Sequence, residues 1–158
     1  MGVRHAWSVI AEKAFRDEAT GQLSLNLIEG ITLRGTFPDP IPVGAAVPAQ
    51  LHLESAWYVE RLDDTQRKTH GRISLLIGTE PVGMQEFDAE VPTGVRVART
   101  KLSFSALPLA NDVLYFVVEQ QVGADFREVA RLPLVLTIDR VTIAEARREM
   151  LGLPRTSG

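Results

Sequence analysis

Apolar and polar side chains alternate with a period of two along much of this chain, and turn residues interrupt the alternation repeatedly. In the segment 49–60, the apolar side chains of Leu51 and Leu53 alternate with His52 and Glu54. Successive side chains of a β-strand point to opposite faces of its sheet, so the pattern predicts strands with one buried and one solvated face. The chain is therefore expected to be mainly β.

The same reasoning divides the chain into a series of predicted strands separated by turns and loops. The first two form a hairpin, because Thr20-Gly21 between them is a turn signal. Residues 37–48 contain four prolines and are expected to cross from one sheet to the other as an extended loop. The predicted strands are 5–14, 22–33, 49–60, 72–77, 84–91, 98–106, 113–121 and 126–138.

The segment 113–121 differs from the others because both of its faces are apolar. One face carries Val113, Tyr115 and Val117, and the other carries Leu114, Phe116 and Val118. A strand with two apolar faces requires a cover on each side. The opposing sheet supplies one cover, and a helix, a loop or a partner must supply the other.

The end of the chain changes from strand to helix periodicity. Thr142 and Glu145 form a T-x-x-E capping box, and Gly152 follows the last helical residue. Ile143, Met150 and Leu151 recur at helical spacing within the predicted helix. We expect this helix to cover the second apolar face of 113–121. The alternative is that Ile143, Met150 and Leu151 dock on another molecule.

These elements predict a two-sheet antiparallel β-sandwich, Ig-like or C2-like, with one C-terminal helix. The sandwich domain is expected to span residues 1–141 and the amphipathic helix 142–151, packed on the domain or extending from it. Residues 152–158 are expected to form a flexible tail. A length of 158 residues fits a single domain.

Composition narrows the environment and the partners. The formal net charge is −3, and the sequence has no long basic run. We therefore expect neither nucleic acid nor a membrane as partner. The first residues lack a secretory signal, and the absence of cysteine rules out disulfides and thiolate metal sites. A cytoplasmic location is expected.

Several segments resemble a family of uncharacterised bacterial β-sandwich proteins, over roughly residues 5–138. The shared features are a strand ending in Ala11-Glu12-Lys13-Ala14, the run 21–31, a Phe-Pro loop at Phe37-Pro38 and the closing segment Leu132-Pro133-Leu134-Val135-Leu136. The chain departs from the family pattern at residues 26–29, where the glycine comes later. The resemblance implies a compact bacterial β-sandwich with no assigned activity, and it transfers no functional residue.

One group of candidate site residues lies on the expected solvated face of 49–60. His52 and Glu54 point the same way, and Tyr58 is an aromatic among polar neighbours, which is typical of a contact surface. If His5 or His70 joined them, His52 and Glu54 would supply donors suited to a divalent metal and a metal-dependent enzyme. The simpler interpretation is that they are ordinary solvated strand residues.

Other ligand sites have weaker signals. Acidic residues near the predicted turns suggest calcium binding between loops, although Asp is common in turns for its own hydrogen bonding. A glycan site needs an exposed aromatic platform, and both Trp7 and Trp57 are expected to point inward. A Ser nucleophile elbow and a phosphate loop are absent from the sequence.

The sequence thus favours a non-enzymatic interaction or accessory module that binds a protein partner or itself. No catalytic residue, metal or cofactor is assigned. The candidate contact residues are His52, Glu54, Tyr58, Ile143, Met150 and Leu151. The metal-dependent enzyme and the calcium- or glycan-binding module are the alternatives.

Overall fold

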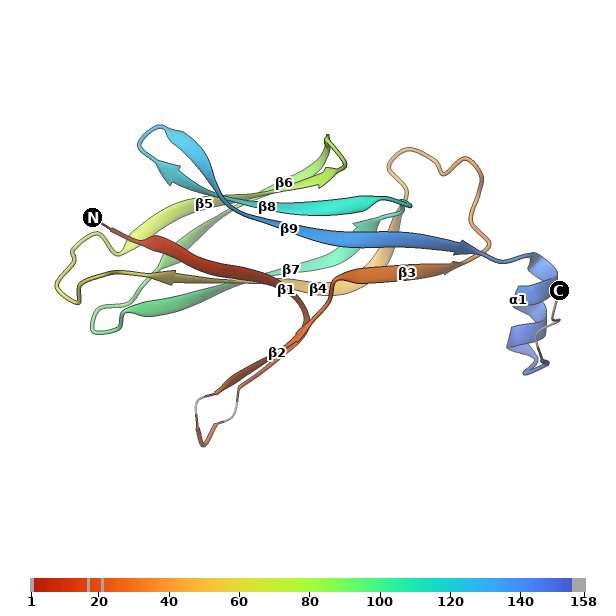
Figure 1. Ribbon diagram of the computed structural model, residues 1–158, viewed down its shortest axis with the longest axis horizontal. Helices are drawn as coiled ribbons and strands as arrows, with labels where there is room; N and C mark the ends of the chain where they lie inside the picture. The colour runs from red at the N-terminus through yellow and green to blue at the C-terminus, as the bar shows by residue number, and fades with distance from the viewer. Residues whose placement is uncertain (1, 17, 21, 155–158) are drawn as a thin grey trace.

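The computed structural model describes residues 2–16, 18–20 and 22–154, and it is mainly β with two sheets and one helix (Figure 1). The strands are β1 (Arg4–Arg16), β2 (Leu23–Leu27), β3 (Gly30–Gly35), β4 (Ala46–Tyr58), β5 (Lys68–Ile77), β6 (Glu80–Glu90), β7 (Val97–Pro108), β8 (Val113–Val122) and β9 (Asp125–Arg140). The helix is α1 (Ile143–Met150).

Sheet A has the order β2-β1-β4-β7 and is antiparallel throughout. The hairpin expected at the start of the chain is confirmed, because β1 and β2 pair antiparallel. β4 is one of the two inner strands, and it begins at Ala46, inside the segment expected to be loop. The strand therefore begins earlier in this proline-containing segment than the sequence predicts.

Sheet B has the order β3-β9-β8-β5-β6 and is mixed, so the expectation of an entirely antiparallel fold is wrong. The reason lies in the segment 22–33, which was expected to be one strand. It breaks between Leu27 and Gly30, with β2 in sheet A and β3 in sheet B. β3 runs parallel to β9, from the pair Gly30–Val135 to the pair Gly35–Arg140.

The proline-rich loop then returns the chain from β3 in sheet B to β4 in sheet A. The expected crossover between the sheets is confirmed.

The two sheets face each other across one apolar core. The Phe104 ring of sheet A packs edge-on against the Phe116 ring of sheet B at 5.2 Å, and Trp57 packs against Phe87 at 5.7 Å. Burying these large apolar surfaces is the main favourable contribution to folding. The largest fully buried side chains include Trp57, Phe116, Leu53, Ile73, Leu107, Leu114, Leu134 and Leu136.

The two faces of β8 behave largely as the sequence predicts. Leu114, Phe116 and Val118 are fully buried against sheet A, and Val117 on the other face is also buried. The cover of that second face is not α1. The guanidinium group of Arg131 lies over the Tyr115 ring at 5.6 Å, so a side chain of the neighbouring β9 covers part of this face.

The prediction that the helix covers β8 is wrong. α1 lies beyond the end of β9, at the extremity of the molecule (Figure 1), and none of its residues is buried. The strand β9 continues to Arg140 alongside β3, so it carries the following helix past the edge of the core. Of the expected tail 152–158, residues 155–158 lie outside the described residues.

Two expectations about the exposure of side chains are also wrong. A bulge between His5 and Trp7 reverses the alternation of β1, so His5 points to the core and Trp7 points outward. On β4, Glu54 and Ala56 are buried although they lie on the face expected to be solvated. Neighbouring side chains of β1 and β7 cover that face more fully than the alternation alone indicates.

Candidate functional site

The helix α1 presents an apolar surface to solvent. Its first turn is fixed by the predicted capping box, in which the Glu145 N–H donates to the Thr142 hydroxyl at 3.1 Å and the Glu145 carboxylate accepts from the Thr142 N–H at 2.7 Å. Ile143, Met150 and Leu151 are 65%, 87% and 74% exposed. The sequence-predicted contact residues of α1 and its C-cap residue Leu151 are therefore all exposed.

The attachment of α1 to the strands is polar. Arg34 of β3 contacts Glu149 of α1 at 2.6 Å and Asp139 of β9 at 3.6 Å. Successive helix residues are rotated by about 100°, which places Glu149 on the side opposite Ile143 and Leu151. The apolar side chains consequently point away from the rest of the chain.

The second predicted group lies on the outer face of β4. His52, Glu54 and Tyr58 share that face, as predicted, but they do not form an open polar site. The Nδ1 atom of His52 is 3.0 Å from the Ser103 hydroxyl on β7, and Glu54 is only 5% exposed. Tyr58 is half-buried between the strand neighbours Arg4 and Val97.

The structure does not complete a metal site around these residues. His5 points to the inner face of sheet A, and His70 lies on β5 in the other sheet, so neither joins His52 and Glu54. Among the described residues, no three histidine or acidic side chains gather as a set of metal ligands. This statement also covers the predicted loop carboxylates, except Asp17, which lies outside the described residues.

Inside sheet A, a chain of polar side chains was missed by the sequence reasoning. The Nε2 atom of His5 is 2.7 Å from the Ser8 hydroxyl, which is 2.6 Å from the Ser55 hydroxyl. Burial lowers the pKa of His5, so the imidazole is neutral near pH 7 and can accept a hydrogen bond. No sequence signal identifies these hydrogen-bonded side chains, because His5 and Ser8 share a face only through the bulge.

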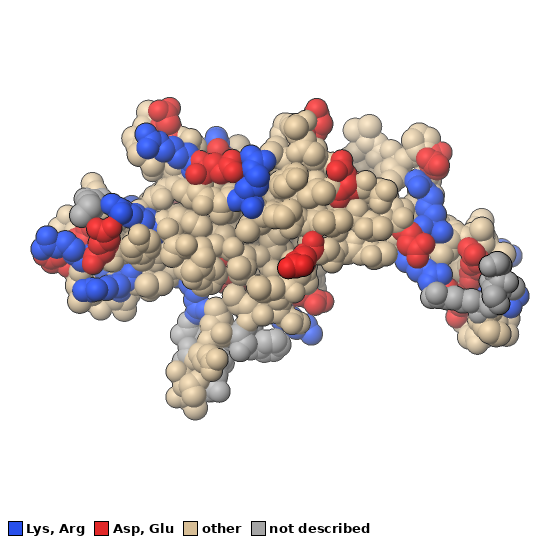
Figure 2. Space-filling model, viewed as in Figure 1, with Lys and Arg blue, Asp and Glu red and all other residues tan. Residues whose placement is uncertain are grey.

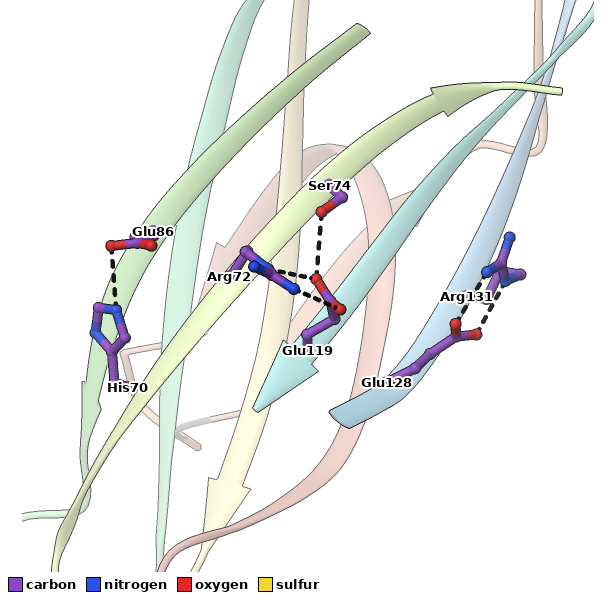
Figure 3. Close-up of polar contacts among 7 residues, drawn as sticks. All are labelled: His70, Arg72, Ser74, Glu86, Glu119, Glu128 and Arg131. Atoms are coloured by element: carbon purple, nitrogen blue, oxygen red, sulfur yellow. Dashed lines mark hydrogen bonds and ion pairs between the residues drawn. The ribbon is translucent and has the colours of Figure 1, made fainter. Parts of the chain in front are cut away.

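A ladder of ionic side chains crosses the outer face of sheet B (Figure 3). Arg72 on β5 donates two hydrogen bonds, at 2.6 and 2.9 Å, to Glu119 on β8, and the Ser74 hydroxyl donates a third at 3.2 Å. These donors, the Arg72 guanidinium first, hold the pKa of Glu119 below its usual range. On β9, Arg131 forms a two-bond pair with Glu128.

His70 forms the edge of the same ladder. Its Nδ1 atom is 2.8 Å from Asp88 and its Nε2 atom is 3.3 Å from Glu86, both on β6. The hydrogen bond to Asp88 is the largest cause that raises the pKa of His70. The contacts Arg72–Glu119 and His70–Glu86 in Figure 3 join neighbouring strands, whereas Glu128–Arg131 lies within β9, so the first two are suited to holding the sheet together.

A cavity of about 710 Å³ lies at the end of the molecule that holds the N-terminus. Its lining is polar, with Thr65, Lys68, Thr69, Glu90 and Gln120 among the residues that contribute. None of the described residues that line it is aromatic, so it offers no stacking platform for a sugar ring.

The described part of the chain contains no helix that is long and apolar enough to cross a membrane. No protein-family model matches the sequence, and no curated protein matches it either.

Proposed function

We propose that this chain is an interaction module that binds another protein chain through α1, on an intracellular bacterial β-sandwich of the Ig-like or C2-like type. The observation that supports this proposal is the position of Ile143, Met150 and Leu151, which are largely exposed on a helix with no buried residue. Large apolar side chains grouped on a surface are typical of a protein contact.

The energetics favour such a contact. Complete burial of one large aliphatic side chain contributes about 1.5–3 kcal/mol, so the three side chains together contribute enough to support binding. The capping box already orders the helix before any partner arrives. A preorganised helix loses less conformational entropy on binding than a disordered segment, which raises the affinity.

The resemblance to uncharacterised bacterial proteins implies no assigned activity, and it transfers no functional residue to this proposal. The polar attachment of α1 supports the proposal. Arg34 contacts the helix through Glu149, and no residue of the helix is buried.

The test replaces the three exposed side chains by glutamine, which retains helix propensity, in the variant Ile143→Gln, Met150→Gln, Leu151→Gln. We expect association to weaken by roughly a hundredfold, because truncated anchor residues usually dominate binding. Light scattering after size exclusion measures self-association. Crosslinking and mass spectrometry compare the chains bound by the wild type and by the variant.

The matched control carries Val43→Gln and Val82→Gln, which remove exposed apolar side chains elsewhere. The control should bind as the wild type does, and all variants should have the same melting temperature. Equal association of the wild type and the α1 variant would contradict the proposal.

A further inference from the structure

The side chain of Ser8 lies between a half-buried histidine and an open groove. A largely apolar groove of about 440 Å³ lies between β1 and β9. In Figure 2, which faces this side of the molecule, the charged side chains gather mainly toward the two ends and the middle is largely uncharged. Ser8 is 9% exposed, so a molecule that enters the groove can reach it. The groove is lined by Ser8, Val9, Ile10, Leu27, Ile28, Glu29, Leu132, Pro133 and Val135.

The buried hydroxyl groups determine where the Ser8 proton points. The Ser55 hydroxyl is fully buried, and Ser8 is its only hydrogen-bond partner within the described residues. A buried donor is rarely left without an acceptor, so Ser55 donates to Ser8. Ser8 then donates its own proton to Nε2 of His5, at 2.7 Å. His5 is neutral near pH 7, because burial lowers its pKa more than a backbone hydrogen bond at Trp7 raises it. A serine hydroxyl that donates to a neutral imidazole has the arrangement of a nucleophile with its general base.

The backbone of β1 supplies a hydrogen-bond donor on the groove side. β2 pairs with β1 only from Ala11 onward, so within the described residues no strand pairs with the segment 4–10 on that side. The Ile10 carbonyl accepts the Ile28 N–H at 3.2 Å there, and the backbone groups of residues two apart in a strand point the same way. The Ser8 N–H therefore points toward the groove side. It can donate to a carbonyl oxygen that gains negative charge when Ser8 attacks the carbonyl carbon.

We infer that Ser8 is a nucleophile toward esters of apolar acyl groups, with His5 as its general base. The Ser8 oxygen attacks the acyl carbon while its proton passes to Nε2 of His5. The ester C–O bond then breaks, and the leaving alcohol takes that proton from His5. A water molecule attacks the acyl-serine with the help of the same base, which releases the carboxylic acid and restores the Ser8 hydroxyl.

The lining of the groove determines the class of substrate. Leu27 and Val135 are 58% and 47% exposed, so an acyl chain that lies against them removes apolar surface from water. Among the described residues that line the groove, Glu29 alone is charged. Its carboxylate disfavours an anionic ligand, so the groove selects the uncharged ester over the carboxylate that hydrolysis produces. The reaction uses no residue of α1 and is independent of the proposed function.

The experiment treats the full chain with a fluorophosphonate probe, which labels activated serines, and locates the label by mass spectrometry of the peptides. We expect the label on Ser8 of the wild type. The wild type should also hydrolyse p-nitrophenyl octanoate, and Ser8→Ala should lower kcat/KM by roughly a hundredfold or more. Because the label is located on the wild type, the test remains decisive even if Ser8→Ala fails to fold. A Ser8 that stays unlabelled would overturn the inference.

The matched control is Ser103→Ala, because the Ser103 hydroxyl is also close to a histidine, 3.0 Å from Nδ1 of His52, but neither residue lines the groove. This variant should keep the wild-type rate. The wild-type rate should fall only below about pH 6.5, where His5 gains a proton, and His5→Gln should be as slow as Ser8→Ala. Leu27→Glu should slow hydrolysis of the octanoate more than that of the acetate. Equal rates in the wild type and a folded Ser8→Ala variant would overturn the inference and leave the proposed function unaffected.

Discussion

Each end of the molecule is stabilised by polar interactions, and the kind of interaction differs between the two ends. At the end with the N-terminus, the guanidinium group of Arg67 donates to backbone carbonyls in two loops, those of Leu62, Asp64, Val91, Pro92 and Val95. The Gln120 amide also donates to the Val3 carbonyl at 2.6 Å and to Thr69 at 3.0 Å. At the opposite end, α1 is joined to the strands through Arg34 and Glu149, whose side chains are both exposed in part (Figure 1).

The difference shows that burial determines how much a polar contact stabilises the fold. A half-buried guanidinium group that satisfies several carbonyls cannot be replaced by water without structural change. A solvent-exposed ion pair can exchange its partner for water at little cost. The first end is therefore expected to be structural, and the second is expected to be removable, as a contact element should be.

The largest effect is expected for Arg67→Ala. Removing the guanidinium group leaves several loop carbonyls without a donor, so we expect a loss of about 3 kcal/mol in the free energy of unfolding. Chemical denaturation measures this loss. The control is Arg61→Ala in the same loop, because Arg61 pairs with Asp63 in solvent and should cost less than about 0.5 kcal/mol. Equal losses in the two variants would remove the distinction between the ends.

The pair Arg72–Glu119 tests an intermediate degree of burial. Glu119→Gln should cost about 1–2 kcal/mol, because it leaves the Arg72 guanidinium with a neutral partner in a partly buried site. Glu128→Gln, on the neighbouring strand, removes a more exposed pair and should cost less than about 0.5 kcal/mol.

The pH dependence of the same variants sharpens this test. Since the pKa of Glu119 is lowered in the folded state, its stabilisation is complete above the ordinary carboxyl pKa and is lost as the pH falls through the folded pKa. Wild type and Glu119→Gln should therefore converge in stability in acid. Parallel stability curves down to low pH would contradict the assignment.

A smaller effect on stability is expected from His5, which is hydrogen-bonded to Ser8, itself hydrogen-bonded to Ser55. Its folded pKa is lowered from 6.5, so the unfolded state binds the proton first as the pH falls. Stability should decline below about pH 6.5 until the folded pKa is passed. The variant His5→Gln should lose this part of the pH dependence, which thermal unfolding at several pH values measures.

The smallest effect is expected when α1 is removed by ending the chain at residue 141. No residue of α1 is buried, so the melting temperature should change little, while the association attributed to α1 is lost. A truncated chain that unfolds would show that the helix is structural and would remove the contrast between the two ends.

The regular features of the fold could be predicted from the sequence because they depend on local patterns. The alternation around Leu51 and Leu53 predicts β4, and the two apolar faces of 113–121 predict the buried position of β8. Thr142 and Glu145 predict the start of α1 through a hydrogen bond between neighbours in the chain. Each of these signals lies within a few residues and needs no knowledge of distant segments.

The candidate sites depended on contacts that a one-dimensional pattern does not contain. The exposure of Ile143 and Met150 depends on where β9 ends relative to the core. The burial of Glu54 depends on the side chains of neighbouring strands. The bulge after His5 turned Trp7 outward and placed the His5 side chain within hydrogen-bond distance of Ser8.

By itself, then, the sequence determined the strand and helix content, because backbone propensity and apolar period are local properties. Only the tertiary structure decided that β3 pairs parallel with β9, that a bulge turns Trp7 outward and that α1 stands clear of the core. Those outcomes depend on which distant segments bury one another's surface, and segments of similar pattern compete for the same positions until the whole chain packs.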